Sequence, residues 1–179
     1  MQIWIFSKNC LDKSLSLKLN FVKMPRFIQR LYPERIWAFS RTSNSIYLTF
    51  DDGPIPEVTP WVMDELKKYS AKATFFCIGD NVQKHPEVFR RILSEGHAVG
   101  NHTFNHLYGW KTNTAEYIEN VEKAERQMTT HSEFIIRNSK LFRPPYGKIT
   151  SKQAKILKKK GYKIVMWDII SYDFDATIS

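Results

Sequence analysis

Residues 45–54 read SIYLTFDDGP, an apolar run that ends in two adjacent carboxylates, Asp51 and Asp52. The run predicts a buried strand, and the Gly-Pro pair after the carboxylates predicts a turn. Downstream, similar apolar runs alternate with segments of helical period; the expected strands are 45–50, 73–78, 97–101, 141–142 and 162–167. Continuous apolar strands that alternate with helices predict a parallel α/β fold, in which functional side chains gather at the carboxyl ends of the strands.

Helix-start signals lie in the segments between these strands. The expected helices begin at Thr59 with Pro60 in the first helical position, at Gly79-Asp80-Asn81, at Asn113 with Glu116, and at Thr150 with Gln153. The second of these helices is expected to continue to Gly96. The last ends in the basic run Lys158–Lys160, which suits the negative end of a helix dipole.

A histidine pair follows the third expected strand. Residues 101–106 read NHTFNH, and the spacing of His102 and His106 would place both rings on the same side of one helical turn. Two imidazoles and a carboxylate form a divalent metal site with open positions, and a second carboxylate beside it can act as a general base. Alone, the histidine pair is equally compatible with a solvated loop and Asp51-Asp52 with a turn, but together they favour the metal site. The remaining histidines are predicted to be structural or on the surface: His85, His97 and His131.

An arginine follows the fourth expected strand, in the segment RPPYG at residues 143–147. Two adjacent carboxylates repel each other unless positive charges compensate them. The guanidinium of Arg143 could supply one such charge in a fixed geometry. A rigid turn closed by Gly147 is the simpler interpretation, and the two are compatible because the prolines fix the backbone in either case.

Composition narrows the class of protein. The 179 residues suffice for one domain with a substantial core, and 42% hydrophobic and 25% charged residues are ordinary for a globular protein. The net charge of +9 can attract nucleic acid, anionic membranes or acidic glycans. Nucleic acid is not expected, because no recognition motif accompanies the charge. The two cysteines, Cys10 and Cys77, provide no disulfide framework, and no apolar stretch is long enough to predict a membrane span.

The first 44 residues are expected to be a lead-in segment before a domain over residues 45–179. Residues 1–23 show little pattern typical of regular structure, carry no convincing signal peptide, and leave Met24 as an alternative start to Met1. The rest of the lead-in is amphipathic, with apolar residues at Phe27, Ile28, Leu31, Ile36 and Trp37.

Together, the three polar segments resemble the polysaccharide deacetylase family with the NodB-homology domain, carbohydrate esterase family 4. Its motifs Thr-Phe-Asp-Asp-Gly-Pro, His-Ser/Thr-x-x-His and Arg-x-Pro-x-Gly are matched at Thr49–Pro54, His102–His106 and Arg143–Gly147. The resemblance covers roughly residues 45–175 and implies a distorted (β/α)7 barrel, expected to be incomplete at its C-terminal side in this chain.

The resemblance also implies roles for individual residues. Asp51 would be the general base, oriented and kept ionised by Arg143, and the backbone N–H of Tyr146 would help to bind the oxyanion. The metal ligands would be Asp52, His102 and His106, around an ion that is most often Zn²⁺, with Co²⁺, Ni²⁺ or Mn²⁺ as alternatives. The implied reaction is metal-dependent removal of N-acetyl groups from N-acetylglucosamine-type polysaccharides, such as peptidoglycan or chitin-like glycans.

Two later motifs of the family depart from its pattern. In the fourth, Asp-x-x-Asp-Trp, only Asp173 is matched, since Ile170 and Phe174 replace the other two residues. Asp168 is an alternative residue for tuning the catalytic acid. The fifth, Leu-x-His, which would supply that acid, is not reached before Ser179, so the chain is expected to be a fragment.

These departures leave a second function open, that of a non-catalytic, metal-dependent glycan-binding module. The family usually works at the cell envelope, and the sequence predicts neither a location, nor the exact glycan, nor an oligomeric state.

Overall fold

The computed structural model describes residues 3–6, 22–39, 45–132, 136 and 140–171. The strands are β1 (Ile3–Phe6), β2 (Tyr47–Asp51), β3 (Ala73–Cys77), β4 (Ala98–Asn101), β5 (Leu141–Phe142), β6 (Lys163–Ile164) and β7 (Ile169–Ile170). The α-helices are α1 (Arg26–Leu31), α2 (Val58–Lys68), α3 (Gly79–Lys84), α4 (Pro86–Ser94), α5 (Thr114–Thr129) and α7 (Ser151–Lys159). Two 3₁₀ turns, Gly109–Lys111 and Pro145–Gly147, complete the described elements.

The strands form one seven-stranded sheet in the order β6-β5-β4-β3-β2-β1-β7. Each pair from β2 to β6 is parallel, whereas β1 is antiparallel to both of its neighbours. Because these strands are parallel, the carboxyl ends of β2, β4 and β5 all lie at the same end of the sheet. The predicted parallel α/β fold is therefore confirmed, with one antiparallel strand inserted.

The sheet must curl, because its two edge strands are consecutive in the sequence. Ile164 ends β6 and Ile169 begins β7. Five residues of extended chain span at most about 18 Å. Seven strands laid flat would separate the two edges by about 29 Å, at about 4.8 Å per strand. The short connection thus holds the sheet in the curved form of a partial barrel.

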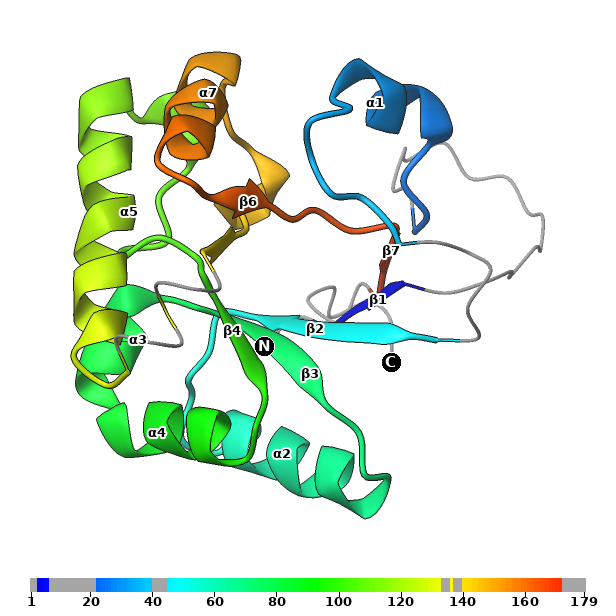
Figure 1. The fold of residues 1–179 in the computed structure, drawn as a ribbon, viewed down its shortest axis with the longest axis vertical. Coiled ribbons are helices and arrows are strands. Elements are labelled where there is room, and N and C mark those ends of the chain that lie inside the picture. Colours follow the sequence, from blue (N-terminus) through cyan, green and yellow to red (C-terminus); the bar gives the residue numbers. More distant parts are fainter. Residues whose placement is uncertain (1–2, 7–21, 40–44, 133–135, 137–139, 172–179) are drawn as a thin grey trace.

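Two clusters of buried side chains hold the helices against the sheet. One lies around β2, β3 and β4 and includes residues of α2, α3 and α4; the other lies around β5 and β6 and includes residues of α7 and Trp37. Side chains of α5 contribute to both clusters. Figure 1 shows α2 and α4 together below the central strands, and α5 standing alongside α7.

The lead-in segment is part of this sheet architecture. The expectation that residues 1–23 lack regular structure is wrong at β1, which pairs with β2 and β7. Ile36 donates to the carbonyl of Ile164 and accepts from the N–H of Met166, both at 2.8 Å, so this segment covers the edge of β6. Trp37 is buried, and its indole N–H donates to the carbonyl of Tyr32 at 3.0 Å.

Several predicted element boundaries are wrong for local reasons. The helix expected over 79–96 is two helices, because Pro86 begins a new one and His85 adopts a non-helical conformation. Thr59 lies inside α2, whose N-cap is Glu57, although its hydroxyl accepts from the N–H of Ile55 at 2.9 Å. The strand expected over 162–167 is reduced to β6, and the following residues pair with the lead-in segment.

Helix starts were predicted better where a side chain caps the backbone. Asn113 accepts from the N–H of Glu116, and Thr150 and Gln153 form a complete capping box.

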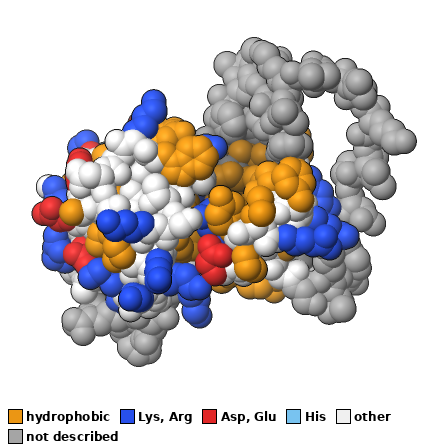
Figure 2. All heavy atoms as spheres, turned by 90° about the horizontal axis from the view of Figure 1, so that it is seen from above, with side chains coloured by type: hydrophobic (Ala, Val, Ile, Leu, Met, Phe, Trp, Pro, Cys, Tyr) orange, Lys and Arg blue, Asp and Glu red, His pale blue; other side chains and the backbone are white. Residues whose placement is uncertain are grey.

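None of the helices in the described ranges is long and apolar enough to cross a membrane. On the face shown in Figure 2, lysine and arginine side chains are scattered widely between hydrophobic patches.

We expect Trp37→Ala to lower the free energy of unfolding by about 3–5 kcal/mol, because it empties a buried site that joins the lead-in segment to the second cluster. Phe27→Ala is the matched control, since Phe27 belongs to the same segment and is 62% exposed. Chemical denaturation monitored by circular dichroism measures both. Equal, small losses in the two variants would show that the lead-in does not stabilise the domain.

A second prediction concerns His97, whose buried ring accepts the N–H of Ala73 at Nδ1. Burial, together with the charges of Lys72 and Arg91, lowers the pKa of His97 below 6.5. A base with a lowered pKa in the folded state contributes stability above pH 6.5 that is lost as the pH falls.

We therefore expect the unfolding free energy to fall more between pH 7 and pH 5 in the wild-type protein than in His97→Asn, whose amide oxygen can replace the acceptor. The difference cannot exceed about 1.4 kcal/mol per pH unit, the limit for one proton. Parallel slopes for the wild type and His97→Asn would refute the role of His97.

Candidate metal and catalytic site

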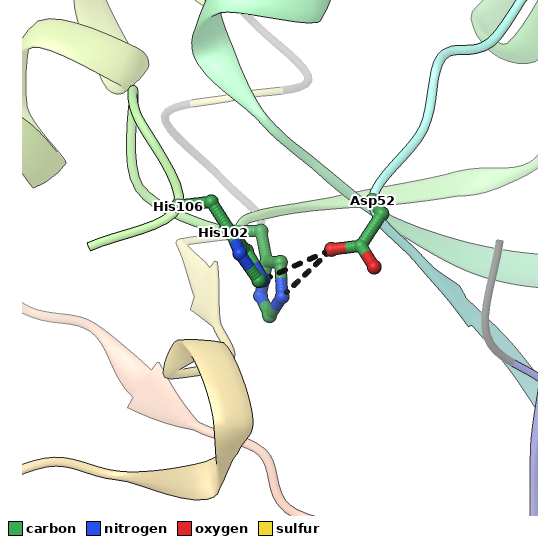
Figure 3. A group of neighbouring side chains, drawn as sticks. All are labelled: Asp52, His102 and His106. Carbon is green, nitrogen blue, oxygen red and sulfur yellow. Dashed lines mark ion pairs between the residues drawn. The ribbon is translucent and has the colours of Figure 1, made fainter. Parts of the chain in front are cut away.

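Asp52 faces both histidines of the predicted cluster. Its Oδ1 lies 3.1 Å from Nε2 of His106 and 3.4 Å from Nε2 of His102. Figure 3 shows the carboxylate approaching the two rings from the opposite side of a shared space. The three candidate ligand atoms all lie within 4.8 Å of one another.

The geometry around Asp52 suits an ion better than hydrogen bonds. Its buried Oδ1 has no hydrogen-bond partner among the described residues, despite the two nearby ring nitrogens. Ligands around tetrahedral zinc at about 2.0–2.1 Å lie about 3.3 Å from one another, close to the two distances observed. One carboxylate and two imidazoles are a ligand set that zinc accepts. These three residues therefore fit a divalent cation.

His102 presents a defined nitrogen to this space. Its Nδ1 lies 2.7 Å from the carbonyl oxygen of Arg143, which can only accept, so Nδ1 carries the proton and Nε2 is left for the ion. Burial acts to lower the pKa of His102, but Asp51 and Asp52 outweigh it and the pKa is raised. Burial also acts to raise the pKa of Asp52, but the contacts with His102 and His106 outweigh burial and lower this pKa below its usual range.

The histidine pair is carried by a loop, and the predicted helical turn is wrong. Thr103 and His106 have positive φ angles of 64° and 55°, which no α-helix contains. Asn120 holds this loop from α5: its Oδ1 accepts from the N–H groups of Phe104 (2.7 Å) and Asn105 (3.0 Å). The rings of His102 and His106, four residues apart in the sequence, are therefore brought together by a loop whose backbone is held in place, and not by a helical turn.

Three asparagines that the sequence analysis missed position the candidate metal ligands. Besides Asn120, Asn101 accepts from the N–H of Thr103 and donates to the carbonyl of Val121, both at 2.8 Å. Asn81 donates to the carbonyl of Asp52 at 2.7 Å. Asn101 directly precedes His102. The sequence marks Asn81 only as part of a helix start and gives no signal for Asn120, because both bond to distant backbone groups.

Asp51 and Arg143 form a buried ion pair beside the cluster. Nη1 of Arg143 lies 2.8 Å from Oδ1 of Asp51, and the two side chains are 0% and 2% exposed. Burial raises the pKa of Asp51, and the positive charges of Arg143 and His102 oppose that rise. The sequence-based expectation that Arg143 compensates the acidic pair is thus supported by direct contact with Asp51.

The guanidinium of Arg143 is held in place on several sides. Nη1 also donates to the hydroxyl of Thr49 and Nη2 to the carbonyl of Met166, both at 2.8 Å, while Nε donates to the carbonyl of Val165 at 3.3 Å. The ring of Phe76 lies against it, 4.1 Å from ring centre to Cζ. The guanidinium is planar, so these bonds fix the directions of all its N–H groups. The N–H group that donates to Asp51 therefore also fixes the orientation of the Asp51 carboxylate.

Tyr146 lies at the rim of the site. Its φ of 57° and that of Gly147, 67°, give the segment after Arg143 a left-handed turn. A Cβ on Gly147 would lie 2.4 Å from the ring of Trp167, so only glycine fits there. The ring of Tyr146 stands 4.6 Å from that of His106, between ring centres. All six predicted site residues are therefore brought together.

The alternative residues for tuning an acid are placed differently. Asp168 is buried and accepts from the side-chain amide of Gln29 at 3.2 Å, so α1 of the lead-in segment reaches it. Ile170, which replaces the expected aspartate, is buried in the second hydrophobic cluster. Asp173 lies outside the described residues.

Relatives of the chain are peptidoglycan and chitooligosaccharide deacetylases. A peptidoglycan-N-acetylglucosamine deacetylase of Bacillus cereus is 41% identical over 134 residues, which are 73% of this chain and 60% of that protein. A chitooligosaccharide deacetylase of Azorhizobium caulinodans is 35% identical over 76% of this chain and 64% of that protein. The chain spans 50–60% of the length of two Bacillus cereus relatives that it matches.

A solved structure extends the likeness to three dimensions. PdaA of Bacillus subtilis, a family 4 carbohydrate esterase, is 27% identical in sequence. The match covers 85% of this chain and 64% of the PdaA chain, with a TM-score of 0.74. The sequence profile of the polysaccharide deacetylase family matches residues 40–165. That match covers more than half of the chain and includes the three polar segments, so this chain belongs to the polysaccharide deacetylase family.

Proposed function

We propose that this chain is the metal-dependent deacetylase domain of an enzyme that removes N-acetyl groups from N-acetylglucosamine-type glycans, peptidoglycan or chitin-like polymers. The observation that carries the proposal is the cluster of Asp52, His102 and His106 directly beside the Asp51–Arg143 ion pair. Relatives whose names specify deacetylation of peptidoglycan or chitooligosaccharides support it.

The ion proposed for the three ligands is Zn²⁺, with Co²⁺, Ni²⁺ or Mn²⁺ as alternatives. A bound divalent cation supplies Lewis acidity toward a water molecule and an amide carbonyl. The residues themselves prepare the site for it, because His102 is oriented through Nδ1 and Asp52 is held through its backbone by Asn81. Such outer contacts fix ligand geometry and raise metal affinity.

Asp51 is proposed as the general base that takes a proton from the attacking water. A base must be ionised, yet burial favours its neutral form; the adjacent guanidinium of Arg143 supplies the opposing charge. Arg143 also fixes the direction of the carboxylate, which makes it a positioning residue. The backbone N–H of Tyr146 is proposed as a donor to the oxyanion that develops during attack.

Release of the amine requires an acid, and in the family an aspartate tunes that acid. Ile170 occupies the place of this aspartate here, and it cannot accept or donate a proton. A non-catalytic glycan-binding module is therefore the second candidate function. It predicts binding of the same glycans with no release of acetate.

We expect the protein to bind one zinc ion per chain, and Asp52→Asn to lower the zinc affinity by more than the roughly 10–100-fold that the loss of an outer hydrogen-bond partner costs. Isothermal titration with zinc measures this without any need for turnover. Asp64→Asn, a change at an exposed aspartate of α2, is the control and should leave the affinity unchanged. Equal affinities in the two variants would place the ion elsewhere.

We expect acetate release from N-acetylglucosamine oligomers or peptidoglycan by the zinc-loaded full-length protein, and a loss of about 10²–10⁴-fold in kcat in Asp51→Asn. Asp51→Asn should still bind zinc, since the ligands are unchanged. Undiminished activity of this variant would exclude Asp51 as the base. Glycan binding without acetate release by the wild-type protein would favour the second candidate function.

A further inference from the structure

A row of aromatic rings leads away from the metal ligand His106. Its ring centre lies 4.6 Å from that of Tyr146, which lies 5.3 Å from Tyr108, which in turn lies 6.5 Å from Trp110. We refer to Tyr146, Tyr108 and Trp110 as the aromatic ridge. Tyr146 and Trp110 are each 58% exposed. The ridge is therefore an apolar surface that begins at the candidate active site and remains open to solvent.

The loop that carries Tyr108 and Trp110 is fixed by hydrogen bonds to residues at the start of α7 and just before it. The indole N–H of Trp110 donates to the carbonyl of Ile149 at 3.1 Å. The fully buried side-chain amide of Gln153 donates to the carbonyls of Gly109 (2.9 Å) and Thr112 (3.2 Å). These bonds join the loop to the start of α7, so the rings are presented by a rigid support.

Two lysines lie over the rings of the ridge. Nζ of Lys148 is 4.4 Å from the ring centre of Trp110, and Nζ of Lys111 is 5.4 Å from that of Tyr108. Both are ordinary cation–π distances. The ridge thus combines aromatic faces, against which the C–H faces of a sugar can stack, with two positive charges able to pair with an anion.

We infer that the aromatic ridge binds the sugar next to the N-acetylglucosamine unit that is deacetylated, and that Lys111 and Lys148 favour a neighbour that carries a carboxylate. This inference rests on the proposed function, because the ridge is identified as a neighbouring sugar site by its position next to the proposed site of deacetylation. The ligand chemistry is that of a strand in which N-acetylglucosamine alternates with N-acetylmuramic acid, whose lactyl ether ends in a free carboxylate wherever no stem peptide is attached. A neutral chitin-like strand offers the same stacking faces and no anion.

The test compares three tetrasaccharides by isothermal titration with the zinc-loaded protein: the alternating strand with free carboxylates, the same strand as its methyl esters, and tetra-N-acetylchitotetraose. Trp110→Ala should weaken binding of all three by roughly threefold to tenfold, the range typical of a lost aromatic contact. Lys111→Gln/Lys148→Gln should weaken only the free acid, by about two- to tenfold for two exposed ion pairs.

Matched controls separate these effects from general damage to the fold. Trp61→Ala removes an equally exposed tryptophan, 60%, from α2, and Lys67→Gln/Lys159→Gln removes the same charge from other helices. Both should bind like the wild type. Trp110→Phe keeps an aromatic face without the hydrogen bond to Ile149, and we expect it to retain affinity within about twofold if stacking is the main contribution.

The inference is overturned if Trp110→Ala binds like Trp61→Ala, or if the double lysine variant weakens the free acid and the methyl ester equally. Acetate release, measured on the same samples, separates the two proposals. Binding that depends on the ridge without acetate release would overturn the deacetylase activity and support the ridge. Acetate release with identical affinities and KM values in all variants would support the activity and overturn the ridge.

Discussion

The buried ion pair between Asp51 and Arg143 is the constraint on which the site depends. Both side chains lie almost completely out of water, where an unpaired charge costs about 3–5 kcal/mol. Arg143 follows β5, Asp51 ends β2, and the remaining guanidinium donors need carbonyls at Val165 and Met166. The pair is therefore satisfied only when the sheet has curled enough to bring the segment after β6 over the centre of the site.

The lead-in segment covers one edge of the curled sheet. A partial barrel leaves the backbone of its edge strand unpaired, and an unpaired edge invites association. Here Ile36 pairs with the chain on either side of Val165, and Trp37 fills the adjacent hydrophobic cluster. The same residues that cover the edge thereby steady the two carbonyls that hold Arg143. One set of contacts thus covers the edge of the sheet and fixes the partners of the Asp51–Arg143 ion pair.

The candidate metal site and the aromatic ridge share a second feature: loops rather than helices carry their side chains. Thr103, His106 and Tyr146 all adopt left-handed backbone conformations, and buried amides of Asn101 and Gln153, together with that of the less buried Asn120, hold the loops to the helices. Backbone in such conformations is costly unless its surroundings fix it. The amide side chains provide that fixing, so the rings of His106, Tyr146 and Tyr108 can form one continuous surface.

The sequence alone determined the alternation of strands and helices, the family, and six residues that the structure brings together, because apolar periodicity and the short motifs are local signals. Tertiary structure alone decided the rest. The helical turn predicted for His102 and His106 is a loop, in which the distant side chain of Asn120 accepts from the N–H groups of Phe104 and Asn105. The strand at residues 3–6 and the role of Ile36 depend on pairing with distant segments. Such pairings leave no periodicity in the residues that make them, and for that physical reason only the folded chain reveals them.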